Sequence, residues 1–197
     1  ISIVPGPPVQ LVAVIPSTIT CGETFSLKLK AEDMWGNPTN QGVKKIIPKT
    51  NQPIKNLPEF INIKEGDFAT VVSGLVVNSA GALEIKLHSS DGSLVATCNP
   101  SKIFNSSILK NYWGDLHGQS EETLGTNSAT DYFAFGRDLA FLDVCAHQGN
   151  DFQMTDTFWK DLNKITAQFN EDGKFITLPG YEWSGNTALG GDRNVLF

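Results

Sequence analysis

The amino-acid sequence predicts an all-β sandwich over residues 1–110 followed by an α/β unit over residues 111–197. Short apolar runs between turn residues fill the first part, whereas two segments with helical spacing alternate with short apolar strands in the second. The charge changes at the same boundary. Residues 1–110 hold ten Lys and Arg against eight Asp and Glu, and residues 111–197 hold five against thirteen.

About seven short strands are expected in the first domain. Residues 25–32 alternate between apolar and polar side chains, which is the period of a half-buried strand. Residues 83–88 repeat this alternation, and Asp91-Gly92 marks a tight turn after them. Further strands are expected at residues 9–15, 43–47, 60–63, 69–77 and 94–97. Short strands with regular turns and no helical period are typical of an immunoglobulin-like sandwich.

Helices and strands alternate in the second domain. Helices are expected over residues 128–139, with Ser128 as N-cap, and over 155–170, along which apolar side chains form one stripe. Strands are expected at residues 112–116, 141–146, 174–178 and 193–197. This order is typical of a parallel sheet, either a small open α/β unit or the first part of a barrel. The barrel is favoured, because the final strand stands at the end of the sequence.

Composition excludes several classes of protein. A net charge of −6 argues against a general nucleic-acid binder. No apolar run approaches the roughly 20 residues that span a bilayer, so no membrane segment is expected. The first residues, ISIVP, contain no initiator Met and no basic segment of a signal peptide. We therefore expect a trimmed N-terminus, from which localisation cannot be inferred, and the oligomeric state stays open.

The three cysteines, Cys21, Cys98 and Cys145, lack the CxxC spacing of a thiolate zinc site. Cys21 and Cys98 both lie in the first domain. They either form a disulfide across the sandwich or remain buried free thiols.

Two of the three histidines and one glutamate follow consecutive predicted strands of the second domain. His117 ends the first strand, His147 ends the second, and Glu182 follows the third. Because the carboxyl ends of parallel strands lie at one edge of a sheet, these side chains are expected to converge. Imidazole and carboxylate groups together suit zinc, manganese or iron. Asp115 is expected to be a further ligand or to orient His117.

The segments that carry these residues resemble the PHP (polymerase and histidinol phosphatase) superfamily. The resemblance rests on residues 112–117 (YWGDLH), 180–184 (GYEWS) and 191–195 (GDRNV), and it covers most of residues 110–197. It is greatest to a branch in which a β-sandwich precedes the metal-dependent domain. It implies a distorted (β/α)7 barrel, here present in part, with two or three divalent metal ions that act on phosphoesters.

The resemblance also implies a set of metal ligands, with two departures from the family pattern. Gln119 stands where the family has a second His, and Ala146 stands where it has an Asp before His147. Gln119 is kept as a ligand through its amide oxygen. A ligand in the loop after the first strand is expected at Glu121 or Glu122. The expected metal-ligand set is Asp115, His117, Gln119, Glu122, His147 and Glu182.

The sequence therefore predicts a metal-dependent hydrolase in which an activated water attacks a phosphoester or a related ester. The expected substrate is a small anionic ester, with Arg193 and Asp192 as substrate-binding candidates. Arg193 either holds the anion or pairs with Asp192. The alternative is a non-catalytic binding or structural protein, in which the sandwich is a docking module and the second domain is a degenerate scaffold. The departures at Gln119 and Ala146 favour this alternative.

Overall fold

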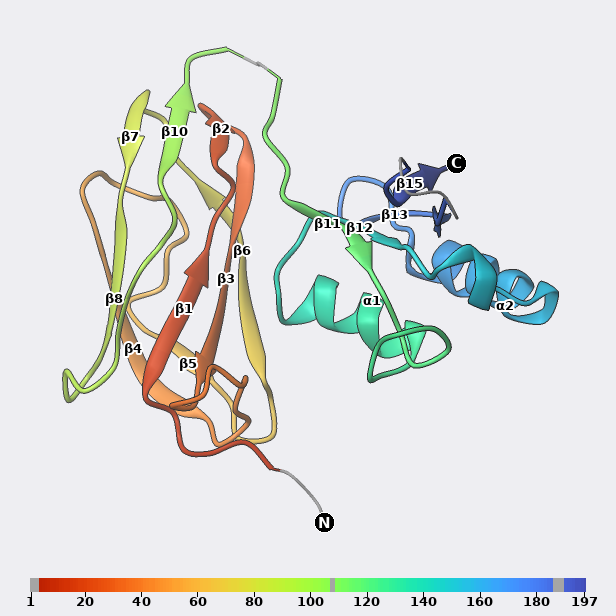
Figure 1. Cartoon of the computed structure of the whole chain (residues 1–197). Helices are drawn as coiled ribbons and strands as arrows, with labels where there is room; N and C mark the ends of the chain where they lie inside the picture. Colours follow the sequence, from red (N-terminus) through yellow and green to blue (C-terminus); the bar gives the residue numbers. More distant parts are fainter. Residues whose placement is uncertain (1–3, 107–108, 186–189) are drawn as a thin grey trace. The chain divides into compact units, whose positions relative to one another are not determined.

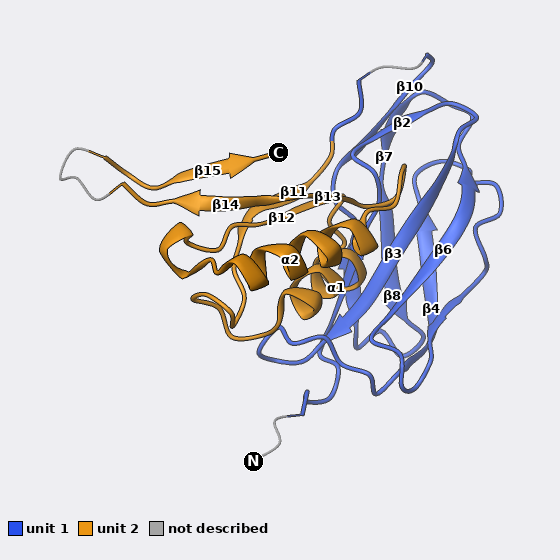
Figure 2. Ribbon diagram, turned by 90° about the vertical axis from the view of Figure 1, so that its right-hand side faces the viewer, with its two compact units in different colours: residues 1–111 blue, residues 112–197 orange. Residues whose placement is uncertain are grey.

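The computed structural model describes residues 4–106, 109–185 and 190–197 (Figure 1). The chain divides into two units, Ile1–Asn111 and Tyr112–Phe197, coloured separately in Figure 2. Each unit is described by itself.

The first unit consists of β-strands, as its alternating apolar and polar side chains require. Its strands are β1 (Gln10–Val14), β2 (Thr18–Thr20), β3 (Thr24–Glu32), β4 (Val43–Thr50), β5 (Ile61–Ile63), β6 (Ala69–Val76), β7 (Gly81–Leu83), β8 (Ile85–Ser89), β9 (Val95–Thr97) and β10 (Ser101–Phe104). They form three sheets with the orders β1-β3-β6, β2-β10-β7 and β5-β4-β8-β9. The β2–β10 pair is parallel, and the other pairs are antiparallel.

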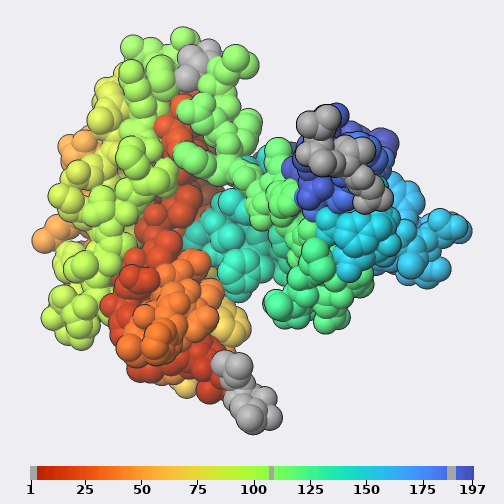
Figure 3. Space-filling model, viewed as in Figure 1, coloured from red at the N-terminus to blue at the C-terminus, as the bar shows by residue number. Residues whose placement is uncertain are grey.

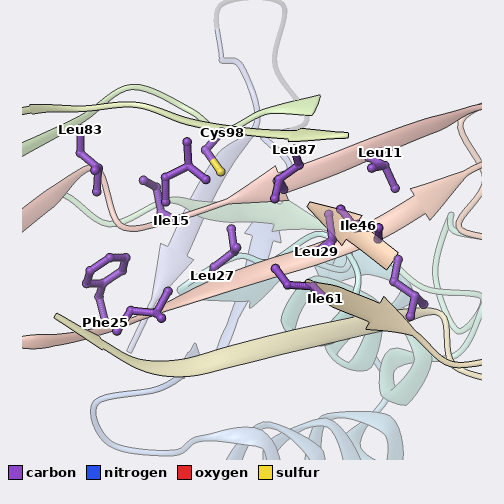
Figure 4. Close-up of a cluster of buried hydrophobic side chains, with 14 of the residues drawn as sticks. Leu11, Ile15, Phe25, Leu27, Leu29, Ile46, Ile61, Leu83, Leu87 and Cys98 are labelled. Carbon is purple, nitrogen blue, oxygen red and sulfur yellow. The ribbon is translucent and has the colours of Figure 1, made fainter. Parts of the chain in front are cut away.

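One hydrophobic cluster joins these sheets. Alternate residues of β3, such as Leu27 and Leu29, are fully buried and contribute to a cluster with side chains from β1, β4, β5 and β8 (Figure 4). Each such leucine stabilises the fold by roughly 1.5–3 kcal/mol relative to an exposed position. Of the two alternatives for Cys21 and Cys98, the structure has free thiols. Burial raises the pKa of Cys98 to about 12.

The turn after β3 is organised by the carboxylate of Asp33. It accepts hydrogen bonds from the backbone N–H groups of Gly6, Trp35 and Asn37, each at 2.9 Å. These hydrogen bonds lower the pKa of Asp33 to about 2, and the bond from Gly6 has the largest effect. The indole of Trp35 stands at the tip of this turn and is 79 % exposed. The connection from β3 to β4 lies at the surface of the unit (orange in Figure 3).

The second unit combines a parallel sheet with an antiparallel hairpin. Its elements are β11 (Gly114–Gly118), α1 (Ala129–Asp138), β12 (Val144–His147), the short 3-10 helix η1 (Asp151–Gln153), α2 (Asp156–Phe169), β13 (Ile176–Leu178), β14 (Gly180–Trp183) and β15 (Arg193–Leu196). β11, β12 and β13 pair in parallel, and β14 pairs with β15. Both helices lie on one face of the parallel sheet (Figure 2).

Side-chain caps and a small core fix the two helices. The hydroxyl of Ser128 accepts from the N–H of Asp131, and that of Thr155 accepts from the N–H of Phe158. Both are ordinary N-cap bonds. Between the helices and the sheet lie the buried residues Ala129, Phe133, Cys145, Leu162 and Phe175.

The predicted fold class was wrong. The protein is mostly β, and its described residues form several small sheets with two α-helices and no (β/α)7 barrel. Residues 180–183, expected in the loop between the third and fourth strands, form β14, and the fourth expected strand, β15, pairs antiparallel with it. Only nine residues separate these two strands. A parallel return needs a crossover of about a dozen residues or more, so this connection favours a hairpin.

In the part of the chain that the structure describes, no helix is long and apolar enough to cross a membrane.

Replacing Phe133 by Ala tests the core of the second unit. The Phe133 side chain is fully buried, with its ring 5.2 Å from that of Tyr132 and 5.7 Å from that of Phe169. We expect Phe133→Ala to lower the free energy of unfolding by about 3–5 kcal/mol, measured by urea denaturation. Phe135→Ala, on the same helix but 49 % exposed, is the control and is expected to cost less than about 1 kcal/mol. Equal losses in the two variants would contradict this core.

Candidate functional site

The carboxylate of Glu182 is the centre of a polar cluster in the second unit. Glu182 lies on β14 and is 7 % exposed. Its Oε2 atom accepts hydrogen bonds from Nδ2 of Asn150 at 2.8 Å and from Nε2 of Gln119 at 3.1 Å. Its Oε1 atom lies 3.6 Å from Nε2 of His117. Two amide groups therefore hold one carboxylate oxygen, and the other faces an imidazole.

The amide of Gln119 has a defined orientation. Its Oε1 atom accepts from the hydroxyl of Thr123 at 3.0 Å and from the backbone N–H of Leu124 at 3.3 Å. A backbone N–H can only donate, so the amide oxygen must be on that side. The amide nitrogen consequently faces Glu182, and it also donates to Oδ1 of Asn150 at 3.1 Å. In this orientation Gln119 acts as a donor to the carboxylate and does not present the amide oxygen expected of a metal ligand.

Backbone pairing brings these segments together. β11 and β12 are parallel, and beyond their ends the N–H of Gln148 donates to the carbonyl of Gly118 at 2.7 Å. The N–H of Glu182 then donates to the carbonyl of Gly149 at 3.0 Å. Three chain segments therefore run side by side where the cluster lies. Asn150 contacts both Gln119 and Glu182. It is not among the site residues that the sequence pattern predicts.

His117 is held by a residue of the hairpin. Its Nδ1 atom lies 2.7 Å from Oδ1 of Asn194, whose Nδ2 donates to the carbonyl of Leu116 at 2.7 Å. Asn194 stands opposite Glu182 in the register of β14 and β15, so both side chains lie on one face of the hairpin. Asp115 accepts from the backbone N–H of His117 at 2.9 Å. Asn194 was not predicted as a site residue. Its place beside His117 depends on the pairing of β14 with β15, which the sequence pattern does not specify.

His147 has different partners. It is 1 % exposed, with Nε2 2.7 Å from the hydroxyl of Ser120. Its Nδ1 atom accepts from the backbone N–H of Gly149 at 3.2 Å. The ring hydrogen therefore lies on Nε2 and is donated to Ser120. Both ring nitrogens are occupied, so this arrangement offers no lone pair to a metal ion.

Burial also determines the charge of His147. Desolvation lowers its pKa to about 4, against a smaller opposite effect from the charge of Glu122. The rings of Tyr132 and Phe158 stand edge-on to the imidazole, with centroids 6.1 and 5.6 Å away. His147 is therefore a neutral packing residue at neutral pH.

The remaining predicted residues are exposed. Glu122 and Asp192 both lie on the surface. Arg193 precedes Asn194 on β15. Its guanidinium lies 5.7 Å from the centre of the Trp183 ring. Successive residues of a strand point to opposite faces. Arg193 and Asn194 consequently lie on opposite faces of the hairpin, so Arg193 is directed away from Glu182.

Among the described residues, no group of three or more His, Cys, Asp or Glu side chains could hold a metal ion. His117 and Glu182 are two such side chains that the fold does bring together.

Residues 92–197 match the model of a family described as a protein of unknown function, DUF3604. The chain belongs to the DUF3604 family. Similar proteins include two uncharacterised proteins, one from Chlamydia pneumoniae, 28 % identical over 187 residues, and one from Chlamydia trachomatis, 28 % identical over 185 residues. Each alignment covers 92 % of this chain and 30 % of the relative. The chain thus spans about a third of the length of these relatives.

Two solved structures share a limited likeness with this DUF3604 chain. The ZirS C-terminal domain has a TM-score of 0.35 at 20 % identity, with 53 % of this chain and 71 % of that chain covered. The PKD domain of an M14-like peptidase from Thermoplasmatales archaeon SCGC AB-540-F20 has a TM-score of 0.28 at 13 % identity, with 50 % and 92 % covered. These scores are too low to support an argument about fold or function.

The resemblance to the PHP superfamily was wrong. The family that matches is DUF3604, and the curated relatives are uncharacterised proteins. The description as a metal-binding PHP-domain phosphoesterase, which accompanied the resemblance, is corrected with it. The described residues contain neither the barrel nor a group of three or more His, Cys, Asp or Glu side chains that could hold a metal ion.

The pKa of His147 predicts a pH-dependent stability. An unfolded histidine binds a proton below about pH 6.5, whereas folded His147 does so only near pH 4. Between these values the unfolded state binds more protons, so stability falls as pH falls, by up to about 3 kcal/mol. We expect His147→Gln, which keeps a donor for Ser120 without titrating, to lack this part of the pH dependence in urea denaturation between pH 7 and about pH 4.

His88→Gln, in the first unit, controls for the loss of a histidine elsewhere. Stability curves with the same pH dependence in the wild type and in His147→Gln would show that His147 is not held neutral by burial.

Proposed function

We propose that this chain carries a cation-dependent site for the hydrolysis of a small anionic ester, centred on His117 and Glu182. The observation that carries the proposal is the 3.6 Å separation between Nε2 of His117 and Oε1 of Glu182. This distance is longer than an ordinary hydrogen bond, so the two atoms face each other without being tightly paired. An imidazole nitrogen and a carboxylate oxygen this close together suit zinc, manganese or iron.

The surroundings of Glu182 support its role as an anionic ligand. The carboxylate is nearly buried, and the two amide donors on Oε2 restrict its rotation. A third polar group, the hydroxyl of Ser184, lies 3.4 Å from Nδ2 of Asn150. Orienting contacts of this kind around a ligand typically change metal affinity by about 10- to 100-fold.

The exposure of His117 supports access from solvent. Its side chain is 52 % exposed, whereas that of Glu182 is 9 % exposed. The pair therefore lies at the edge of the polar cluster, with a rigid carboxylate inside and an accessible imidazole outside. A divalent cation held there would supply Lewis-acid activation of water and compensate the charge of an anionic ester.

A non-catalytic binding role is the second candidate. It is favoured by the orientation of His147 and Arg193, which have partners other than His117 and Glu182. A cation site with two protein ligands from this chain could bind an anionic group without hydrolysing it. The relatives are about three times as long as this chain. What the whole protein does is part of the same proposal.

Glu182→Gln tests the site. The substitution keeps an acceptor for Asn150 and Gln119 but replaces the anionic oxygen that faces His117. We expect the 197-residue chain to bind Zn²⁺ in calorimetric titration, and the variant to bind it at least about tenfold more weakly. Asp172→Asn, an exposed acid of the same unit, is the control and should bind as the wild type does.

Turnover separates the two candidate functions. The product of the whole reading frame, loaded with Zn²⁺ or Mn²⁺, is assayed with p-nitrophenyl phosphate. Cation-dependent turnover that Glu182→Gln abolishes supports hydrolysis, whereas binding without turnover of this ester favours the binding role. Equal Zn²⁺ affinity in the wild type and in Glu182→Gln would overturn the site itself.

A further inference from the structure

We infer that Asn194 is a positioning residue that sets the tautomer of His117, so that the β14–β15 hairpin controls whether Nε2 of His117 is available to a cation. The cation rests on the proposed function, whereas the tautomer rests on the hydrogen bonds alone. Asn194 lies 77 residues from His117 in the sequence, and its Oδ1 atom is 2.7 Å from Nδ1 of His117.

The Asn194 amide has a defined orientation. Its second polar atom is 2.7 Å from the backbone carbonyl of Leu116. A carbonyl can only accept, so the amide atom beside it must be the nitrogen, Nδ2. The oxygen, Oδ1, is therefore the atom that faces His117.

The orientation of this amide fixes the position of the imidazole hydrogen of His117. Oδ1 of Asn194 carries no hydrogen, so the 2.7 Å contact requires one on Nδ1 of His117. Neutral imidazole has a single ring hydrogen. With that hydrogen on Nδ1, the Nε2 atom keeps its lone pair, and Nε2 is the ring nitrogen that lies 3.6 Å from Oε1 of Glu182.

His147 shows the opposite arrangement within the same unit. There a backbone N–H, that of Gly149, donates to Nδ1, and the hydrogen lies on Nε2 toward Ser120. The two histidines are thus fixed in different tautomers by the group beside Nδ1, an acceptor for His117 and a donor for His147. In this unit the neighbour of Nδ1 decides which ring nitrogen carries the hydrogen.

Glu182 and Asn194 are directly opposite each other in the register of β14 and β15. One hairpin therefore supplies both the carboxylate and the amide that orients the imidazole. Because the His117 side chain is 52 % exposed, water would compete for Nδ1 if β15 moved away, and the tautomer would no longer be fixed.

Nitrogen NMR tests this directly. The 197-residue chain is labelled with ¹⁵N-histidine and measured at about pH 9, above the usual titration range of histidine, and His117→Gln assigns the signals. We expect the wild type to carry the hydrogen on Nδ1 of His117. Asn194→Ala should move it wholly or partly to Nε2 and weaken Zn²⁺ binding about 10- to 100-fold in calorimetric titration.

Asn194→Asp keeps an acceptor beside Nδ1 and should restore both the tautomer and most of the Zn²⁺ affinity. Val195→Ala, on the next residue of β15 and on the other face of the hairpin, is the control and should change neither. An unchanged tautomer in Asn194→Ala, or a changed tautomer with full Zn²⁺ affinity, would overturn the inference. If the wild type binds no Zn²⁺ and Asn194→Ala still moves the hydrogen, the proposed function fails and the tautomer control by Asn194 stands.

Discussion

The parallel pairing of β11 with β12 decides where the polar cluster forms, because β11 carries His117 and the segments that follow the two strands carry Gln119 and Asn150. This pairing depends on a close fit at Gly118. The Tyr132 hydroxyl donates to backbone carbonyls of both strands, at residues 115 and 146, over 3.3 and 3.1 Å. A Cβ atom at Gly118 would lie 2.0 Å from the Tyr132 ring. A glycine and a tyrosine that take no part in the cluster therefore determine its geometry.

Electrostatics separates the two histidines that the sequence pattern treats alike. His147 is buried beside the rings of Tyr132 and Phe158 and has a depressed pKa, so it is neutral and donates to the Ser120 hydroxyl. His117 is half exposed and faces a carboxylate. Equivalent positions at the ends of neighbouring strands thus lead to a packing role for one imidazole and a candidate ligand role for the other. The side-chain partners, and not the strand ends, make this difference.

Local patterns in the sequence predict local structure well. Ser128 and Thr155 cap their helices, and α1 and α2 lie where helical spacing places them. The convergence of His117 with Glu182 follows from strand ends at one edge of a sheet. The hairpin of β14 and β15 depends on register and on the length of the intervening connection, which apolar periodicity does not encode. Asn150 and Asn194 escape prediction for this reason, and short shared segments such as YWGDLH and GYEWS did not specify the barrel that they suggested.

The Asp33 turn has a practical consequence for optical measurements on this DUF3604 chain. Trp35 is the one tryptophan of residues 1–111, and the other three lie in residues 112–197. Its indole is already 79 % exposed in the native state. Unfolding of the first unit therefore changes the solvent environment of tryptophan very little, whereas Trp159 of the second unit packs against the rings of Tyr181 and Phe197. Intrinsic tryptophan emission consequently reports mainly on the second unit, and the β-strands of the first unit need a different probe, such as far-ultraviolet circular dichroism.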